Sequence, residues 1–338
     1  MALLIFIVIL GLVFDFINGF HDAANSISTV VTTKVLSPFQ AVVWAAFFNF
    51  LAFFISKYII GEFGIANTVS ETVYEKYITL PIILAGIIGA IIWSLFTWWQ
   101  SIPSSSSHTL IGSFAGSAIM ANGFAAIHGT VILKIVAFIF FAPLIGMATA
   151  FIISLIILYS CRKVSHIRAE VWFKRLQLVS SALFSTGHGL NDSQKVMGII
   201  AAAMVAAHPL HIGLGIGSVS DIPDWVAFAC FTAISLGTMS GGWRIIKTMG
   251  TKITKVTPFE GVVAETAGAI SLYLTEYLKI PVSTTHTIAG AIIGVGATKR
   301  LSAVRWGVTR ELMISWILTI PVSACLGAGI YLIISTFV

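Results

Sequence analysis

Two short runs of hydroxyl side chains stand where an oxyanion-binding site would need them. Each run follows a proline, Pro103 in the first and Pro281 in the second. Proline suits the first turn of a helix, and hydroxyls together with the free backbone N–H groups of a helix N-terminus cradle an anion well. The hydroxyls could instead cap the helices or bond to carbonyl groups, but two matched runs favour contact with a substrate. The residues assigned to this substrate site are Ser104, Ser105, Ser106, Ser107, Thr109, Ser283, Thr284 and Thr285.

Two aspartates lie inside apolar runs, where a charge needs a partner. Asn25 lies close to Asp22, and Asn191 sits beside Asp192. A charged group inside a bilayer is costly unless it pairs with another charge or binds a cation. Carboxylate and amide oxygens, with the carbonyls of an unwound helix, suit Na⁺ or a proton. These four residues therefore predict a site for a coupling ion. The alternative is that they are structural hydrogen-bond anchors.

Lys195 makes the surroundings of the two aspartates different. It stands one helical turn after Asp192, where the first half of the chain has Asn25. Its ammonium group could pair with Asp192, replace a bound cation or contact the anion directly, and we count it among the substrate-binding residues. The competing interpretation is that it snorkels to the membrane surface.

Other ionisable residues at membrane depth have weaker cases. Glu265 precedes the second hydroxyl run and is a candidate proton carrier at the coupling-ion site, whereas His108 and His286 repeat with the runs and favour a structural hydrogen-bonding role. The sequence has neither a nucleophile-and-base constellation nor a Walker-type loop, and its cysteines lack metal-binding spacing. We therefore expect a transporter and not an enzyme, with no resident metal and no cofactor besides a transported H⁺ or Na⁺.

The composition of the chain places these residues in a membrane. The 338 residues are 57% hydrophobic and 9% charged, with a net charge of +6, whereas soluble domains carry about 25% charged residues. Apolar runs long enough to span a bilayer, about 20 residues each, recur along the whole chain. Orientation in the lipid bilayer then explains the basic residues, and nucleic acid is not expected as a partner.

Apolar runs divide the chain into two halves of about five membrane elements each. We expect an all-α polytopic membrane protein with broken helices at the midplane. Its domains would be a first repeat at 1–160, a basic cytoplasmic linker at 161–176 and a second repeat at 177–338. The expected elements are 2–33, 39–60, 80–99, 103–122 and 131–160 in the first half, and 177–207, 225–246, 258–278, 281–297 and 308–337 in the second.

An internal repeat supports this division. Segment 102–112 recurs as 280–290, offset by 178 residues, and segment 19–25 aligns more weakly with 189–195. An odd number of crossings per half inverts the second copy, as in many secondary transporters. With both termini outside, most Lys and Arg residues, including those of the central linker, fall inside, as a correct topology requires. We expect both hydroxyl-bearing elements to cross the membrane and the glycine pairs within them to pack against neighbouring helices.

Four motifs resemble those of the inorganic phosphate transporter (PiT) family, and the resemblance covers nearly the whole chain. It implies an inverted-repeat symporter that holds phosphate between the two hydroxyl motifs and coupling ions at the two Asp/Asn motifs. The motifs are NGFHDAAN at 18–25, PSSSSH at 103–108, HGLNDSQK at 188–195 and PVSTTH at 281–286.

Two residues depart from the family's sodium-coupled pattern, which has Asn-Asp followed by Asn in both halves. His21 replaces the first Asn and Lys195 the last one. The chain is in this respect more similar to bacterial members that couple to protons or carry metal–phosphate complexes. The family also includes sulfate permeases. The leading hypothesis is an H⁺- or Na⁺-coupled phosphate symporter of a prokaryotic plasma membrane, with a homodimer as one option for its assembly. A sulfate symporter and a passive anion channel are the alternatives.

Overall fold

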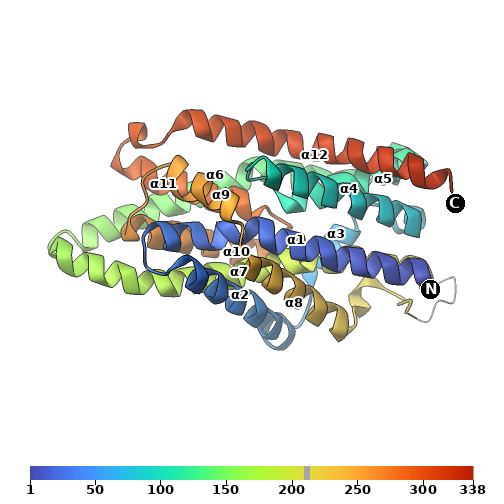
Figure 1. The fold of residues 1–338 in the computed structure, drawn as a ribbon, viewed down its shortest axis with the longest axis horizontal. Helices are drawn as coiled ribbons and strands as arrows, with labels where there is room; N and C mark the ends of the chain where they lie inside the picture. The colour runs from blue at the N-terminus through green and yellow to red at the C-terminus, as the bar shows by residue number, and fades with distance from the viewer. Residues whose placement is uncertain (209–213, 338) are drawn as a thin grey trace.

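The computed structural model, which describes residues 1–208 and 214–337, consists of long helices that run side by side along one axis (Figure 1). No strand occurs in these residues, and the predicted all-α polytopic fold is confirmed. The first half of the chain contains α1 (Ala2–Thr32), α2 (Pro38–Ile55), α3 (Gly64–Ser70), α4 (Leu80–Trp99), α5 (Ser106–Asn122) and α6 (Gly129–Ser160). The second half contains α7 (His166–Ala207), α8 (Asp224–Ser240), α9 (Trp243–Lys247), α10 (Pro258–Tyr277), α11 (Thr284–Lys299) and α12 (Trp306–Ser335).

Five helices of the described chain are long and apolar enough to cross a membrane: α1, α2 with its π-helical extension, α4, α6 and α12. Three others, α5, α8 and α11, have only 17, 17 and 16 residues. α7 and α10 are longer but carry Asp192, Lys195 and Glu265, which dilute their apolar pattern. Length and hydropathy therefore miss these five helices, among them α5 and α11 with the hydroxyl runs and α7 with Asp192.

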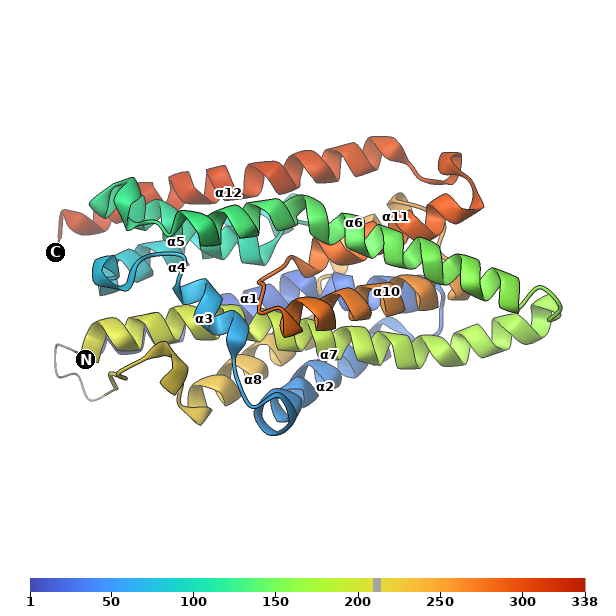
Figure 2. The same cartoon turned by 180° about the vertical axis from the view of Figure 1, so that it is seen from behind.

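α7 begins earlier than the apolar pattern predicts. Its N-cap is Ser165, so most of the expected linker 161–176 is helical. This stretch is charged and largely exposed, and a search for apolar runs does not detect a helix of that kind. The turn between α6 and α7 projects from the end of the bundle opposite the chain termini (Figure 2).

α4 and α10 end in the same kind of turn. Ser101 and Lys279 follow these helices with left-handed backbones, φ 59° and 56°. Such Schellman turns satisfy the last carbonyls of a helix. A proline and an N-cap serine then start the next helix, with Ser105 before α5 and Ser283 before α11. The closing hydrogen bonds are Ser101 N–H to Trp98 O, Ile102 N–H to Thr97 O, Lys279 N–H to Glu276 O and Ile280 N–H to Thr275 O.

These turns make two helical hairpins, α4–α5 and α10–α11. The first lies toward the end that carries the termini and the second toward the opposite end (Figures 1 and 2). Their tips meet, because Thr285 Oγ1 donates to the Ser104 carbonyl at 3.3 Å and Ser107 Oγ donates to the Val282 carbonyl at 3.1 Å. Hairpins from opposite faces can touch only if each turns back inside the protein. The expectation that both hydroxyl-bearing elements cross the membrane is therefore wrong.

Each hairpin packs on the last long helix of the other half, α5 on α12 and α11 on α6. A Cβ atom at Gly116 would lie 2.0 Å from the Ala324 carbonyl oxygen, and one at Gly290 would lie 2.2 Å from the Pro143 carbonyl oxygen. The predicted packing role of these glycines is confirmed. Pro143 in α6 and Pro321 in α12 are also 178 residues apart, so the internal repeat includes the helices on which the hairpins rest.

Candidate functional site

The two hairpin tips enclose the two aspartates that the sequence analysis singles out. Asp22 in α1 is 2% exposed and Asp192 in α7 is fully buried. Ser106 Oγ donates to Asp22 Oδ2 at 3.0 Å. Thr284 Oγ1 donates to Asp192 Oδ2 at 3.4 Å. Thr285 Oγ1 lies 3.4 Å from Asp22 Oδ1, and its one hydrogen is shared with the Ser104 carbonyl. Hydroxyls of the second tip therefore reach both carboxylates, and a hydroxyl of the first tip reaches Asp22.

Lys195 ties α7 to both hairpins. Its Nζ donates to Asp192 Oδ1 at 2.5 Å, to Ser107 Oγ at 2.5 Å and to the Val282 carbonyl at 2.6 Å. The side chain is only 2% exposed, which rules out the snorkelling interpretation. All three ammonium hydrogens have acceptors, as a buried charge requires.

The two asparagines have different surroundings. Asn25 Nδ2 donates to Thr285 Oγ1 at 2.8 Å and lies 3.5 Å from Thr284 Oγ1. Asn191 is fully buried, and within the described structure neither polar atom of its side chain has a hydrogen-bond partner. A buried amide without partners costs free energy, so a ligand that pairs with Asn191 would be stabilised there.

Four of the predicted hydroxyls serve local structure. Ser105 and Ser283 cap their helices, each accepting from the backbone N–H three residues later at 3.2 Å. Thr109 Oγ1 donates to the Ser105 carbonyl at 2.8 Å, and Ser104 Oγ donates to Thr97 Oγ1 at 2.9 Å. The capping interpretation thus describes Ser105 and Ser283. The hydroxyls that reach an aspartate or Lys195 are those of Ser106, Ser107, Thr284 and Thr285.

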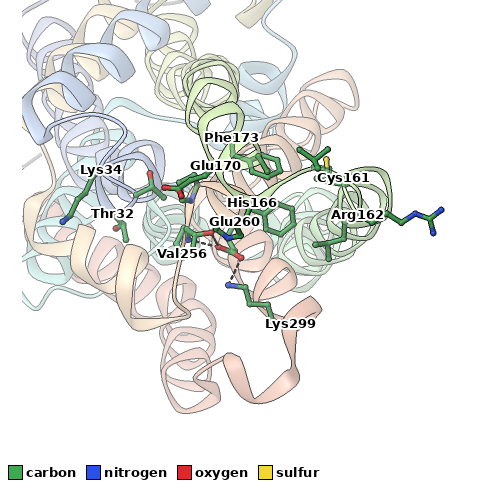
Figure 3. A pocket seen from close by; sticks show the side chains of 18 residues that line it. Thr32, Lys34, Cys161, Arg162, His166, Glu170, Phe173, Val256, Glu260 and Lys299 are labelled. Atoms are coloured by element: carbon green, nitrogen blue, oxygen red, sulfur yellow. Dashed lines mark hydrogen bonds and ion pairs between the residues drawn. The ribbon is translucent and has the colours of Figure 1, made fainter.

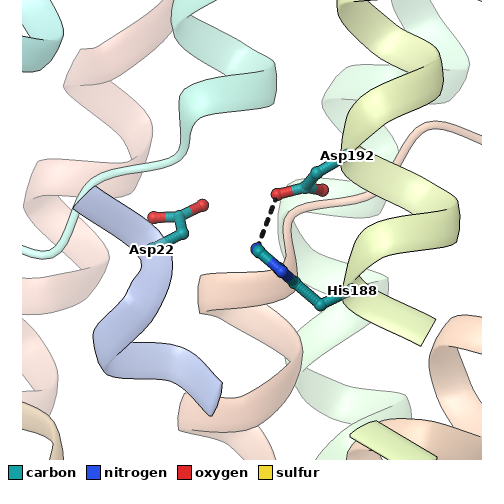
Figure 4. A group of neighbouring side chains, drawn as sticks. All are labelled: Asp22, His188 and Asp192. Atoms are coloured by element: carbon teal, nitrogen blue, oxygen red, sulfur yellow. Dashed lines mark ion pairs between the residues drawn. The ribbon is translucent and has the colours of Figure 1, made fainter. Parts of the chain in front are cut away.

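Two histidines that are not among the predicted site residues border the carboxylates. His21 Nδ1 donates to Asp22 Oδ1 at 2.9 Å. His188 Nε2 lies 3.2 Å from Asp192 Oδ2. One ligand atom from each of Asp22, His188 and Asp192 lies within 4.8 Å of the other two (Figure 4). The available signal was the four-residue spacing of His188 and Asp192, which places both on one face of a helix.

Glu265 belongs to a separate polar cluster. Ser180 Oγ, Thr29 Oγ1 and Gln177 Nε2 donate to its carboxylate at 2.5, 2.6 and 3.0 Å. Thr33 Oγ1 donates in turn to Gln177 Oε1 at 2.8 Å. No hydrogen bond in the described part of the chain joins Glu265 directly to Asp22, Asn25, Asn191 or Asp192, so the structure does not unite the five predicted coupling-ion residues.

A cavity of about 670 Å³ opens beside this cluster at the basic end of the bundle (Figure 3). Thr33 is among its lining residues, so the chain from Thr33 through Gln177 to Glu265 leads from the cavity into the protein. Lys299 forms an ion pair with Glu260 across the cavity wall at 2.7 Å. The charged lining residues are Lys34, Arg162, Glu170, Glu260 and Lys299.

Comparison with known sequences gives a consistent result for the whole chain. The profile of the phosphate transporter family matches residues 18–169 and again residues 160–327. The chain is 46% identical over 332 residues to a probable low-affinity inorganic phosphate transporter of Rhizobium meliloti (strain 1021), covering 97% of this chain and 96% of that protein. It is 44% identical over 339 residues to a protein of the same description from Bacillus subtilis (strain 168), covering 99% and 98%.

A solved structure also resembles this fold. It is described as the sodium-dependent phosphate transporter and superposes with a TM-score of 0.89, covering 100% of both chains. The sequences are 24% identical, so this similarity concerns the fold alone.

Proposed function

The chain is a member of the phosphate transporter family, and on this premise we propose that it imports inorganic phosphate across a bacterial plasma membrane by symport with a cation. Family membership and the two close relatives make it a transporter and not an enzyme. The observation that carries the proposal is the meeting of two hydroxyl-bearing hairpin tips at a pair of buried aspartates.

The anion would lie between the tips. The first N–H groups of α5 and α11 are free of intrahelical partners and carry the positive ends of the helix dipoles. Ser106, Thr284 and Thr285 add hydroxyl donors, and Lys195 adds a positive charge. Hydrogen phosphate also needs an acceptor for its own O–H group, which a carboxylate supplies. Sulfate carries no proton at neutral pH, so this mixture of donors and carboxylates supports phosphate.

The cation would bind at the aspartates. Asp22 and Asn25 offer oxygen atoms suited to H⁺ or Na⁺. In Asp192, by contrast, Oδ1 pairs with the Lys195 ammonium group and Oδ2 lies beside Nε2 of His188. The two ion positions are therefore not equivalent. A divalent metal that travels with phosphate as a complex is compatible with the Asp22–His188–Asp192 cluster. Glu265, on the way to the basic cavity, is proposed as a proton carrier.

The orientation in the membrane follows from charge. Both termini lie at one end of the molecule and the basic α6–α7 turn at the other (Figures 1 and 2). The excess of Lys and Arg on cytoplasmic loops assigns that turn to the inside and the termini to the outside. The basic cavity would then be the inner vestibule, from which phosphate is released into the cell.

Uptake of radiolabelled phosphate into liposomes that contain the purified protein tests the substrate. We expect unlabelled phosphate to compete strongly and sulfate weakly. Protein-free liposomes give the background, and the variant Glu311→Gln, altered at an exposed position of α12 away from the cavity, is the matched control. If sulfate inhibits the uptake and unlabelled phosphate does not, phosphate is not the preferred substrate, and sulfate takes its place.

A further inference from the structure

A third aspartate, Asp15, lies in α1 two helical turns before Asp22 and apart from the hairpin tips. It is fully buried, and within the described residues neither oxygen of its carboxyl group has a hydrogen-bond partner. The titratable groups that face it from the helices packed against α1 are Asp192, Lys195 and Cys230. Lys195 already pairs with Asp192. Among these neighbours, no positive charge is therefore left to balance an ionised Asp15.

Helices pack closely on α1 on both sides of Asp15. One turn before it, a Cβ atom at Gly11 would lie 2.9 Å from the Ile200 side chain of α7. One turn after it, a Cβ atom at Gly19 would lie 2.1 Å from the Ile234 carbonyl oxygen of α8. A carboxyl group held in such a packed interior is cut off from bulk water. Because an ionised carboxylate without partners is very costly there, the group takes up a proton instead.

We propose that Asp15 is a proton-binding residue of the transport cycle, and that it is a neutral carboxylic acid in this conformation. A carboxylic acid has one donor and one acceptor and so complements an amide, whereas a carboxylate can only accept. Asn18 lies three residues later on the same helix face, and its Oδ1 is also buried without a donor among the described residues. Glu265 is the contrasting case, because three side chains donate to its carboxyl group.

The position of Asp15 suits a proton that enters with phosphate. With the termini outside, Asp15 lies about 10 Å farther out along α1 than Asp22, at 1.5 Å per residue. Glu265, bonded to Thr29 near the other end of α1, lies toward the inside. Phosphate between the tips adds negative charge near Asp15 and favours its protonated form, and by reciprocity the proton favours phosphate binding. This coupling role rests on the proposed symport, whereas the bound proton does not.

Infrared spectra of the purified protein in detergent test the bound proton, because a protonated carboxyl group absorbs where a carboxylate does not and its band shifts in D₂O. We expect the difference between wild type and Asp15→Asn at neutral pH to contain such a band. Asp221→Asn is the matched control, since Asp221 is exposed before α8 and its removal deletes only a carboxylate. A difference spectrum without a protonated-carboxyl band would overturn the proton assignment.

Transport by Asp15→Asn separates a coupling role from a structural one. Asparagine has nearly the shape of the neutral acid, so proteoliposomes with this variant should still exchange internal labelled phosphate for external phosphate. Under an inward H⁺ gradient the variant should fail to raise internal phosphate above the external concentration, whereas wild type and Asp221→Asn should succeed. Accumulation by Asp15→Asn equal to that of wild type would overturn the coupling role and leave Asp15 a structural acid.

The behaviour of wild type separates this inference from the proposed symport. If a Na⁺ or metal gradient drives accumulation and an H⁺ gradient does not, the coupling role is overturned while the symport stands. If no gradient drives it, the symport fails, and the infrared band alone decides whether Asp15 holds a proton. Should Asp15→Asn not fold, Asp15→Ser replaces it, because a serine hydroxyl can bond to the carbonyl one turn earlier. Failure of both neutral variants to fold would show that the fold needs a charged carboxylate, which contradicts the inference.

Discussion

The two aspartates are the residues on which the account depends, and they differ in what else they hold. Asp22 is hydrogen-bonded by hydroxyls and by His21, whereas Asp192 neutralises the buried ammonium of Lys195. Removing one partner of a buried ion pair leaves an uncompensated charge, at a cost of about 3–5 kcal/mol. The same substitution should therefore have different consequences at the two positions.

We predict that Asp22→Asn and Asp192→Asn both abolish coupled phosphate uptake, and that only Asp192→Asn markedly lowers the thermal stability of the purified protein. Uptake into proteoliposomes and the midpoint of thermal unfolding in detergent measure the two effects. Normal uptake by both variants would refute the ion-site assignment, and equal loss of stability would refute the Lys195–Asp192 pairing as the cause.

Lys195 holds a fixed positive charge where Asn25 stands in the first half. We predict that Lys195→Asn shifts the ion dependence of uptake toward Na⁺, because the carboxylate of Asp192 becomes free to bind a cation. Uptake measured across a series of Na⁺ concentrations and pH values reveals the shift. A variant whose response to both ions matches that of wild type would show that Lys195 does not stand in for a bound cation.

At the level of elements, the hairpin turns are what bring the site together. Ser101 and Lys279 hold left-handed backbones that cost a residue other than glycine about 1 kcal/mol or more. We predict that Ser101→Gly raises the thermal unfolding midpoint while Ser101→Ala does not, since glycine suits the C′ position of a Schellman turn. If glycine lowers the midpoint, the turn is held by contacts of the Ser101 side chain and not by its backbone.

At the contacts between the hairpins and the long helices, glycine is already present, and replacing it with a larger residue is expected to be harmful. A side chain at Gly116 would collide with the backbone of α12. We predict that Gly116→Leu separates α5 from α12 and greatly reduces uptake and stability, whereas Gly129→Leu, at a position with open space around it, does neither. Both variants are checked by size-exclusion profile and phosphate uptake, and normal behaviour of Gly116→Leu would contradict the packing.

The sequence predicts the elements and the paired aspartates well because each signal occurs twice. Residue type could not show that Ser105 and Ser283 cap helices, because a capping serine and a ligand serine look alike before the backbone is known. The basic-residue asymmetry could not separate a re-entrant hairpin from two crossings, since both return the chain to the same side. The position of His188 beside Asp22 depends on the packing of α7 against α1, which no local pattern contains.

For the whole molecule, the orientation of the basic cavity is the feature most open to a direct test. Cys161 lines this cavity, whereas Cys230 is buried and Cys325 lies on the apolar helix α12. We predict that a membrane-impermeant maleimide labels wild type in inside-out vesicles and not in right-side-out vesicles. The variant Cys161→Ala should remain unlabelled in both. Labelling of right-side-out vesicles that disappears in Cys161→Ala would reverse the assigned orientation.

The central claim, that the meeting hairpin tips and the aspartate pair move phosphate together with a cation, is tested most directly by accumulation. Proteoliposomes with equal phosphate inside and outside are given an inward gradient of H⁺, Na⁺ or divalent metal, and labelled phosphate is followed. The account predicts that at least one gradient drives phosphate above its external concentration, that an ionophore for that ion abolishes the accumulation, and that Asp22→Asn does not accumulate phosphate. Phosphate that only equilibrates under every gradient would contradict the account and indicate a passive anion channel.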